Sequence, residues 1–262
     1  MHQYLFFIGN FPIRLYGIFF SLGIISGCIT AYFLLKKDRR GWESHMFDLG
    51  LVIAFAGIVG GRLWDVFFFD WEYYHNHLLE IPYIWQGGMA IQGGIIFACI
   101  AAYFYLKKHQ IPVLPFADTV TPRIILGQAI GRIANFMNGD AFGHPTGQDF
   151  GLLYPDTTLA YHTYGAQPLW PAEVWECQGD LLIFVLLLWY GCKTRAEGTT
   201  FCLYIMFYSL LRFFLENYRG DYGTLALGLK SAQLTSLAAF AGAFILFLYF
   251  HFKHKSKSGI SE

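Results

Sequence analysis

Hydrophobic residues of this chain gather in seven long segments that are separated by shorter polar stretches. A helix needs roughly 20 mostly apolar residues to cross a bilayer. The segments that qualify are approximately 14–35, 46–68, 86–106, 119–137, 172–191, 200–217 and 233–252, of which the fourth is the least apolar. The pattern predicts an all-α integral membrane protein, a bundle of seven transmembrane helices forming a single membrane domain over residues 1–262.

Lys and Arg in the loops predict the orientation, because cytoplasmic loops carry an excess of these residues. One side holds Lys36, Lys37, Arg39, Arg40, Lys107, Lys108, Lys193, Arg195, Lys253, Lys255 and Lys257. The other side holds Arg14, Arg219 and Lys230, and the connection 138–170 holds none. We therefore expect the N-terminus outside, the C-terminus in the cytoplasm, and residues 138–170 as an external loop or small head region.

Composition supports a membrane protein. Hydrophobic residues make up 55% of the chain and charged residues only 14%, where a soluble domain carries about 25% charged. The cysteines (Cys28, Cys99, Cys177, Cys192 and Cys202) have no metal-binding spacing and are interpreted as small packing residues. The first apolar run lacks a basic stretch and a cleavage site, which indicates a retained helix. We expect no metal or other cofactor, no nucleic-acid partner, and contact with membrane lipid.

Four arginines lie inside predicted spans, namely Arg62, Arg123, Arg132 and Arg212. Each could cost about 2.5–3.5 kcal/mol at the bilayer centre on insertion scales, so each needs a physical reason. Snorkelling to an interface is one reason, which suits Arg123 and, less well, Arg62. Arg132 and Arg212 are harder to explain in this way.

Polar residues form a stripe on two of the predicted helices. The fourth segment carries Gln128, Arg132 and Asn135 on one face, and the sixth carries Tyr208, Arg212, Glu216 and Arg219. Arg212 and Glu216 could simply neutralise each other. Arg132 has no acidic residue one turn away on its own helix, so we interpret it as an unpaired cation that awaits an anion.

The predicted orientation places five polar residues at similar depth. Arg62, Arg132 and Arg212 fall in the outer halves of their helices, and Tyr16 and Gln92 fall near the outer ends of theirs. This coincidence predicts a cavity in the outer leaflet half that is open to lipid headgroups. Arginine suits a phosphate ligand, because its planar fork of donors keeps its charge.

The fourth segment ends in a motif with specific spacing, Gly131-Arg132-Ile133-Ala134-Asn135-Phe136-Met137-Asn138-Gly139-Asp140 followed by Phe142-Gly143. It closely resembles the signature of the prolipoprotein diacylglyceryl transferases, approximately G-R-x-x-N-F-x-N-G-E-x-x-G. Weaker motifs fit the same family in order along almost the whole chain: Ile13–Gly17, Gly60–Leu63, Gly87–Met89 with Gly93–Gly94, Asp118, and the polar stripe of the sixth segment.

The resemblance implies a seven-helical enzyme of the bacterial inner membrane with its active site in the outer-leaflet half. Such enzymes move the diacylglyceryl group of phosphatidylglycerol to the thiol of the acceptor cysteine in a prolipoprotein signal peptide, which gives a thioether and glycerol phosphate. The resemblance implies that Arg132 binds the headgroup and that Arg212 is essential near the reacting centre. The catalytic candidates are Arg212, Tyr208, Asp140 and Glu216, and the substrate-binding candidates are Arg132, Asn135, Asn138, Gly139, Tyr16, Gln92, Arg62 and Arg219.

Three departures from the family pattern concern the proton that the thiol must lose, at a pKa of about 8.5 in a free cysteine. Gln92 stands where members often have a histidine, and it cannot act as a base. Asp140 replaces the usual glutamate. The family's H-P-S-Q-L-Y-E becomes Trp170 to Glu176, which loses a second histidine. The arginine surroundings, Tyr208, or a carboxylate such as Asp140 or Glu173 must then serve, with His144 as a further candidate.

Two other functions remain open at this point. The chain could be a paralogue with an altered donor or acceptor. It could also be a non-catalytic membrane protein that binds anionic lipid or solute in the same arginine-lined cavity.

Gln92→His is predicted to be tolerated, because it restores the residue that is common in the family. The measurement is diacylglyceryl transfer to a synthetic signal peptide by the variant and the parent. Complete loss of transfer would show that the third segment packs differently in this chain.

Overall fold

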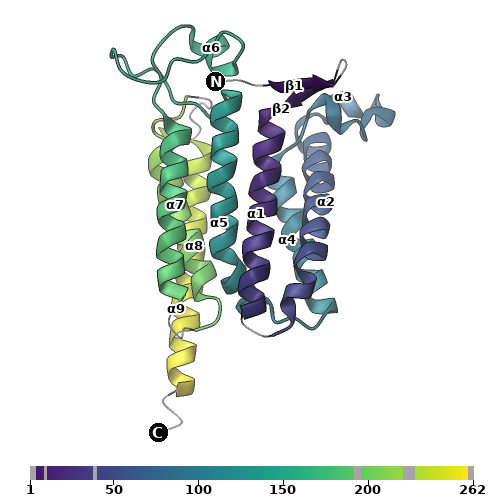
Figure 1. Cartoon of the computed structure of the whole chain (residues 1–262), viewed down its shortest axis with the longest axis vertical. Coiled ribbons are helices and arrows are strands. Elements are labelled where there is room, and N and C mark those ends of the chain that lie inside the picture. Colours follow the sequence, from purple (N-terminus) through teal and green to yellow (C-terminus); the bar gives the residue numbers. More distant parts are fainter. Residues whose placement is uncertain (1–3, 9–10, 38–39, 192–195, 221–227, 259–262) are drawn as a thin grey trace. The chain divides into compact units, whose positions relative to one another are not determined.

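The computed structural model describes residues 4–8, 11–37, 40–191, 196–220 and 228–258 (Figure 1). Cys192, Arg39, Lys193 and Arg195, which entered the sequence argument, lie outside the described residues. The chain forms two compact units. The first unit comprises residues 1–30 and 117–262, and the second comprises residues 31–116.

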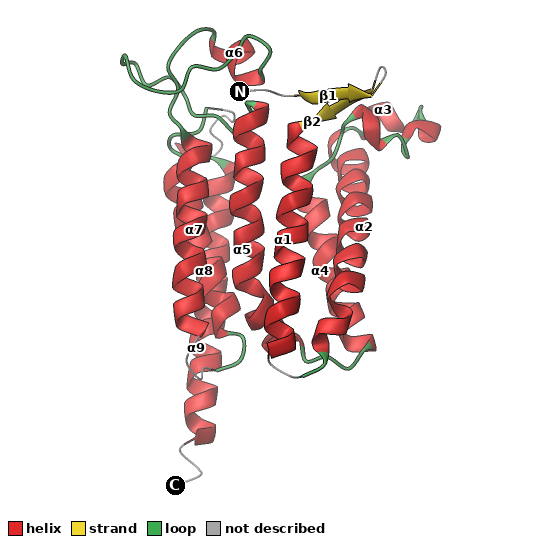
Figure 2. Ribbon diagram, in the orientation of Figure 1, coloured by secondary structure: helices red, strands yellow, loops and turns green. Residues whose placement is uncertain are grey.

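Each predicted apolar segment overlaps one helix of the structure (Figure 2). These helices are α1 (Leu15–Lys37), α2 (Met46–Trp64), α4 (Ile91–Lys108), α5 (Val113–Asn138), α7 (Ala172–Gly191), α8 (Thr199–Leu215) and α9 (Ser231–Ser258). Three stretches are long and apolar enough to cross a membrane, namely Leu15–Lys37, Trp42–Phe69 and Ser231–Lys255, and α8 is a shorter apolar helix. Polar side chains on α5 and α7 build the site described below.

Short elements connect these helices. Strands β1 (Tyr4–Ile8) and β2 (Phe11–Arg14) pair antiparallel with Ile8 opposite Phe11. In the second unit, the 3-10 helix η1 (Trp42–His45) precedes α2, and the π-helix η2 (Asp65–Phe69) continues it. The short helices α3 (Trp71–Tyr74), η3 (Leu78–Glu80) and η4 (Ile84–Gln86) lead to α4, and α6 (Leu159–Tyr164) lies in the first unit. These elements have too few residues to show a periodic pattern in the sequence, so the sequence did not predict them.

Glycines allow α2 and α4 of the second unit to pack closely. A methyl group at Gly93 would overlap the carbonyl oxygen of Gly60 and the Cβ of Trp64, and one at Gly60 would lie 2.6 Å from the carbonyl oxygen of Gly93. Small residues at such crossings let the backbones of membrane helices approach. Gly93 therefore has a packing role between α2 and α4.

Glycines also allow α1 and α5 of the first unit to pack closely. A methyl group at Gly23 would lie 2.8 Å from the carbonyl oxygen of Gly127. A second link fixes α8 beside α5, because the carboxylate of Asp118 accepts hydrogen bonds from the backbone N–H groups of Gly198 (2.6 Å) and Phe201 (2.9 Å). Asp118 thus caps the N-terminus of α8, where a negative charge also suits the helix dipole.

Residues 139–171 form a small head with its own core in the first unit, built from Phe142, Tyr154, Ala160 and Leu169. Backbone hydrogen bonds attach this head to the end of α8. The N–H of His144 donates to the carbonyl of Tyr218 (2.9 Å), and the N–H of Gly220 donates to that of Phe142 (3.1 Å). The head therefore holds the chain that follows α5 in a defined position against α8.

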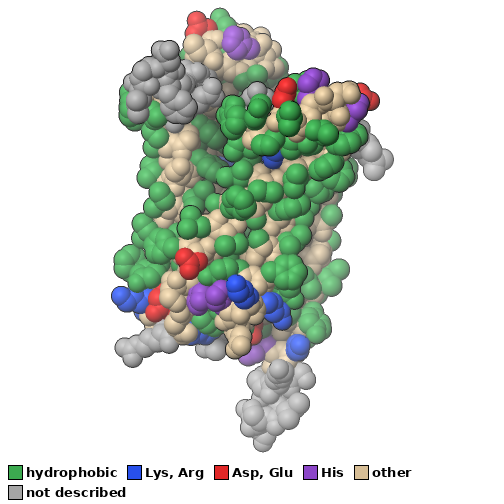
Figure 3. Space-filling view, turned by 90° about the vertical axis from the view of Figure 1, so that its right-hand side faces the viewer, with side chains coloured by type: hydrophobic (Ala, Val, Ile, Leu, Met, Phe, Trp, Pro, Cys, Tyr) green, Lys and Arg blue, Asp and Glu red, His purple; other side chains and the backbone are tan. Residues whose placement is uncertain are grey.

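Hydrophobic side chains cover the middle of the face displayed in Figure 3, and Lys and Arg gather towards one end of it. On the second unit, the exposed apolar side chains include those of Leu51 and Phe55 on α2 and of Ile95, Ile100 and Phe104 on α4. Exposed apolar side chains of this number along two helices are typical of a surface that contacts lipid rather than water.

Gly93→Ala is expected to lower the free energy of unfolding by about 1–3 kcal/mol, because an added methyl group forces α2 and α4 apart. Thermal unfolding in detergent measures the effect. Gly242→Ala in α9 is the matched control, because no atom lies within 4 Å of its added Cβ. Equal melting temperatures for Gly93→Ala and the parent would contradict the close packing of the two helices.

Candidate functional site: a buried arginine–glutamate cluster

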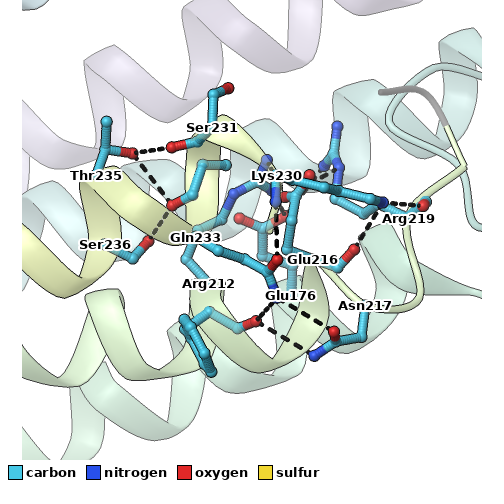
Figure 4. A network of polar contacts seen from close by, with 12 residues as sticks. Glu176, Arg212, Glu216, Asn217, Arg219, Lys230, Ser231, Gln233, Thr235 and Ser236 are labelled. Atoms are coloured by element: carbon cyan, nitrogen blue, oxygen red, sulfur yellow. Dashed lines mark hydrogen bonds and ion pairs between the residues drawn. The ribbon is translucent and has the colours of Figure 1, made fainter. Parts of the chain in front are cut away.

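Three arginines and two glutamates meet in the first unit (Figure 4). Arg132 comes from α5, Glu176 from α7, and Arg212 from α8. Glu216 and Arg219 follow directly at the C-terminal end of α8. We call these five residues the arginine cluster.

Glu176 lies at the centre of the arginine cluster, with its side chain only 1% exposed. Its Oε1 lies 2.7 Å from Nη2 of Arg132 and accepts a hydrogen bond from the hydroxyl of Tyr208 (3.2 Å). Its Oε2 lies 3.2 Å from Nη1 of Arg212 and 3.5 Å from Nη1 of Arg219. One carboxylate therefore joins three guanidinium groups and links α5, α7 and α8.

Glu216 provides the second anionic centre. Its Oε2 lies 2.8 Å from Nη2 of Arg212 and 3.9 Å from Nε of Arg219. The ammonium group of Lys230 donates hydrogen bonds to the carbonyl oxygens of Glu216 (2.8 Å) and Arg219 (2.5 Å), at the edge of the cluster (Figure 4). The ion pair between Arg212 and Glu216, which the sequence left as an alternative, is present in the structure.

The interpretation of Arg132 as an unpaired cation is wrong. Its acidic partner, Glu176, belongs to α7, and sequence spacing relates only residues on one helix. Arg132 nevertheless keeps 20% of its side chain exposed, and Arg212 keeps 15%. With three arginines against two glutamates, the cluster carries a net positive charge and retains accessible guanidinium surface, as an anion-binding site requires.

The signature residues after Arg132 form a hydrogen-bonded turn. Nη1 of Arg132 donates to Oδ1 of Asn135 (3.2 Å). The side-chain amides of Asn135 and Asn138 then donate to the two carboxylate oxygens of Asp140, at 2.8 and 2.9 Å. Gly139 has a φ of 72°, a backbone conformation that favours glycine. This turn orients Asn135, and through it the guanidinium of Arg132.

Two tyrosines border the arginine cluster. The hydroxyl of Tyr208 lies between Glu176 and Arg132. It donates a hydrogen bond to Glu176 and accepts one of 3.4 Å from Arg132. Tyr16 lies in the first turn of α1, half-buried, with Arg132 and Asp140 among its electrostatic neighbours. The structure therefore brings Tyr16 together with the residues of α5 that the sequence analysis selected.

The head contributes a buried contact to α7. The hydroxyl of Tyr154 donates a hydrogen bond to the carboxylate of Glu173, which is fully buried at the start of α7. Burial, and then the negative charge of Glu173, raise the pKa of Tyr154 well above its ordinary value. Of the other candidate bases, His144 has its Nδ1 2.9 Å from the carbonyl oxygen of Pro145.

Arg62 and Gln92 belong to the second unit. The Arg62 side chain is buried against the ring of Tyr74, and its N–H groups donate hydrogen bonds of 2.7–3.0 Å to the carbonyl groups of Glu80, Ile81, Gly87 and Gly88. These contacts give Arg62 a structural role in holding the loop between α2 and α4. Gln92 is exposed in the first turn of α4.

Two buried carboxyl groups of α7 were not predicted from the sequence: Glu176, which belongs to the arginine cluster, and Asp180, which lies beside the cluster without an ion pair among the described residues. Both are fully buried on α7. Their spacing of four residues places them on one helix face, and this was the signal available for finding them. Within the described part of the chain, no group of three His, Cys, Asp or Glu side chains is arranged to hold a metal ion.

Long helices with exposed apolar side chains, together with a cluster of charged side chains buried in the protein interior, define a multi-pass helical membrane protein. The family description "Prolipoprotein diacylglyceryl transferase" matches residues 3–249. The chain belongs to this family, as the signature that begins at Gly131 in α5 predicted.

Relatives that carry the name phosphatidylglycerol–prolipoprotein diacylglyceryl transferase are similar over nearly the whole chain. One from Clostridium botulinum is 35% identical over 238 residues, which cover 90% of this chain and 92% of the relative. One from Staphylococcus saprophyticus is 36% identical over 234 residues (88% and 82%). One from Halalkalibacterium halodurans is 33% identical over 245 residues (92% and 84%).

Glu176→Gln is expected to destabilise the protein by about 3–5 kcal/mol, because it removes the shared carboxylate and leaves buried guanidinium groups uncompensated. Thermal unfolding in detergent checks this. Gln178→Ala on the exposed side of the same helix is the control and should unfold like the parent. A parental melting temperature for Glu176→Gln would mean that the arginines do not depend on this carboxylate.

Proposed function

We propose that this protein transfers the diacylglyceryl group of phosphatidylglycerol to the thiol of the acceptor cysteine in prolipoprotein signal peptides. The observation that carries the proposal is the net positive arginine cluster on a family signature that runs through Arg132, Asn135 and Asp140. Membership of the transferase family supports the same reaction.

The chemistry explains why a cationic site is needed. The cysteine sulfur forms a bond to the terminal glyceryl carbon, and the bond from that carbon to the phosphate oxygen breaks. A phosphodiester with a single negative charge becomes glycerol phosphate, which carries more negative charge. Guanidinium groups beside the leaving oxygen stabilise that developing charge.

The geometry supports distinct roles for the two exposed arginines. Arg132, oriented by Asn135 and by the turn of Asn138, Gly139 and Asp140, binds the phosphodiester. Arg212, on α8, contacts Glu176, the carboxylate that also contacts Arg132, and it stabilises the leaving phosphate. Glu216, which also pairs with Arg219, holds Arg212 in place. Tyr208 completes the coordination of Glu176, and Tyr16 borders the headgroup.

The thiol loses its proton under the influence of the arginine cluster. The reaction balances because the glycerol phosphate that leaves can take up that proton on its new phosphate oxygen, whose second pKa is about 6. Both carboxylate oxygens of Asp140 accept hydrogen bonds from asparagine side chains, and Glu173 is engaged by Tyr154. Neighbouring arginines lower the pKa of a thiol and so favour the nucleophilic thiolate. A histidine base is therefore not required, which is consistent with Gln92 and Trp170 at the positions where the family has histidine.

We further propose that the whole chain forms one membrane domain of seven spans, with the N-terminus outside and the C-terminus in the cytoplasm. The distribution of Lys and Arg among the loops supports this orientation. It places the arginine cluster in the outer leaflet half of a bacterial inner membrane, the side from which an exported signal peptide reaches the enzyme. Gln92, exposed in the first turn of α4, remains a predicted substrate-binding residue.

The test is a transfer assay in liposomes with phosphatidylglycerol and a synthetic signal peptide, with a Cys→Ala peptide as control. We expect the peptide mass to rise by one diacylglyceryl unit only when the cysteine is present. Folded, lipid-bound protein that gives no product would favour the non-catalytic binder. Product with other donors or acceptors only would favour the paralogue.

Arg132→Ala is expected to reduce transfer by about 10²-fold or more, the usual loss when one group that stabilises a developing negative charge is removed. Arg40→Ala is the matched control, because Arg40 is exposed in the second unit and stacks on Trp42. Both variants should insert into the membrane. Transfer near the parental rate by Arg132→Ala would refute the assignment of Arg132 to the headgroup.

A further inference from the structure

Asp180 is a buried carboxyl group that the reaction described above does not use. It lies on α7 one turn beyond Glu176, and its side chain is fully buried. Within the described residues, neither carboxyl oxygen has a hydrogen-bond partner, and Asp180 forms no ion pair. A group this polar, without a partner in the interior, needs a physical explanation.

The surroundings of Asp180 include groups of both signs. On α7 itself it faces Glu176 and the thiol of Cys177. Arg132 faces it from α5, and Arg212 and Tyr208 face it from α8. Both arginines direct their guanidinium groups at glutamates, so neither neutralises Asp180 through direct contact.

An ionised Asp180 would therefore be unfavourable for two reasons. A buried carboxylate without hydrogen-bond donors loses its hydration with no compensation, and such a group is neutralised by a proton instead. In addition, the negative charge of Glu176 lies one helical turn away, and two like charges at this spacing repel each other. Protonation removes both costs.

We propose that Asp180 is held as a neutral carboxylic acid and acts as a positioning residue, which keeps Arg132 and Arg212 available for a singly charged phosphodiester. The inference rests on the proposed function, because it deepens the account of how the same site binds phosphatidylglycerol. Asp180 itself does not touch the reacting atoms.

Charge bookkeeping shows why the proton matters. The arginine cluster holds three arginines and two glutamates in direct ion-pair contact, which leaves one positive charge. Ionisation of Asp180 would lower this charge by one unit, whatever Lys230 and Asp140 contribute at the edge. It would also offer Arg132 and Arg212 a carboxylate within the protein that competes with the phosphate. A neutral Asp180 matches the site to one negative charge.

The first test is an infrared difference spectrum of wild type against Asp180→Asn in phosphatidylcholine vesicles. We expect the wild type to show the C=O stretching band of a protonated carboxylic acid, and this band to be absent from the variant. Loss of carboxylate bands instead would show that Asp180 is ionised and would overturn the proposal. Asp180→Ala, uncharged and small enough to fit the buried position, gives a second difference spectrum should the first variant fold poorly.

The second test compares lipid binding and transfer. Asp180→Asn should keep the thermal stabilisation that phosphatidylglycerol gives relative to phosphatidylcholine, and its transfer should stay within about tenfold of wild type. Glu176→Gln is the contrasting variant, because loss of an ionised partner should abolish both. Asp180→Asn behaving like Glu176→Gln would overturn the proposal. Absence of transfer by the wild type itself would refute the proposed function, while the infrared band and the lipid stabilisation still test Asp180.

Discussion

The first unit depends on one constraint, that charges taken out of water must be neutralised inside the protein. Glu176 meets this constraint for three arginines that come from α5, α8 and the turn after α8. Ion pairs of this kind in a low-dielectric interior are strong and directional, so they also set the positions of the helices that carry them. The cluster is thus both a structural junction and a place of excess positive charge.

The two units solve the problem of a buried arginine in different ways. Arg62 donates its N–H groups to backbone carbonyls, which are polar but uncharged. Among the described residues its ion-pair partner is Asp65, at 4.0 Å. Arg132 and Arg212 have carboxylate partners and keep part of their surface accessible. An arginine enclosed by carbonyl groups organises a loop, whereas arginines in a net positive and partly open cluster are suited to bind an anion.

The head stabilises this arrangement from outside the helices. Its backbone bonds to Tyr218 and Gly220 fix the chain beyond α8, where Glu216 and Arg219 stand. Tyr154 reaches the start of α7 at Glu173, three residues before Glu176. Loop 138–170 thereby contacts the start of α7 and the chain that follows α8, two of the three helices that supply the cluster. This explains how a connection without any Lys or Arg still contributes to an anion site.

The sequence by itself determined the helices, the family, and the contacts within one helix. Apolar runs and their spacing are local properties, so the seven long helices and the spacing that allows the pair Arg212–Glu216 could be read from them, whereas the short helices α3 and α6 could not. The partner of Arg132, the loop role of Arg62 and the isolation of Asp180 could not be predicted. Each depends on which helix face or loop lies opposite, and only tertiary packing decides the neighbours of a buried charge.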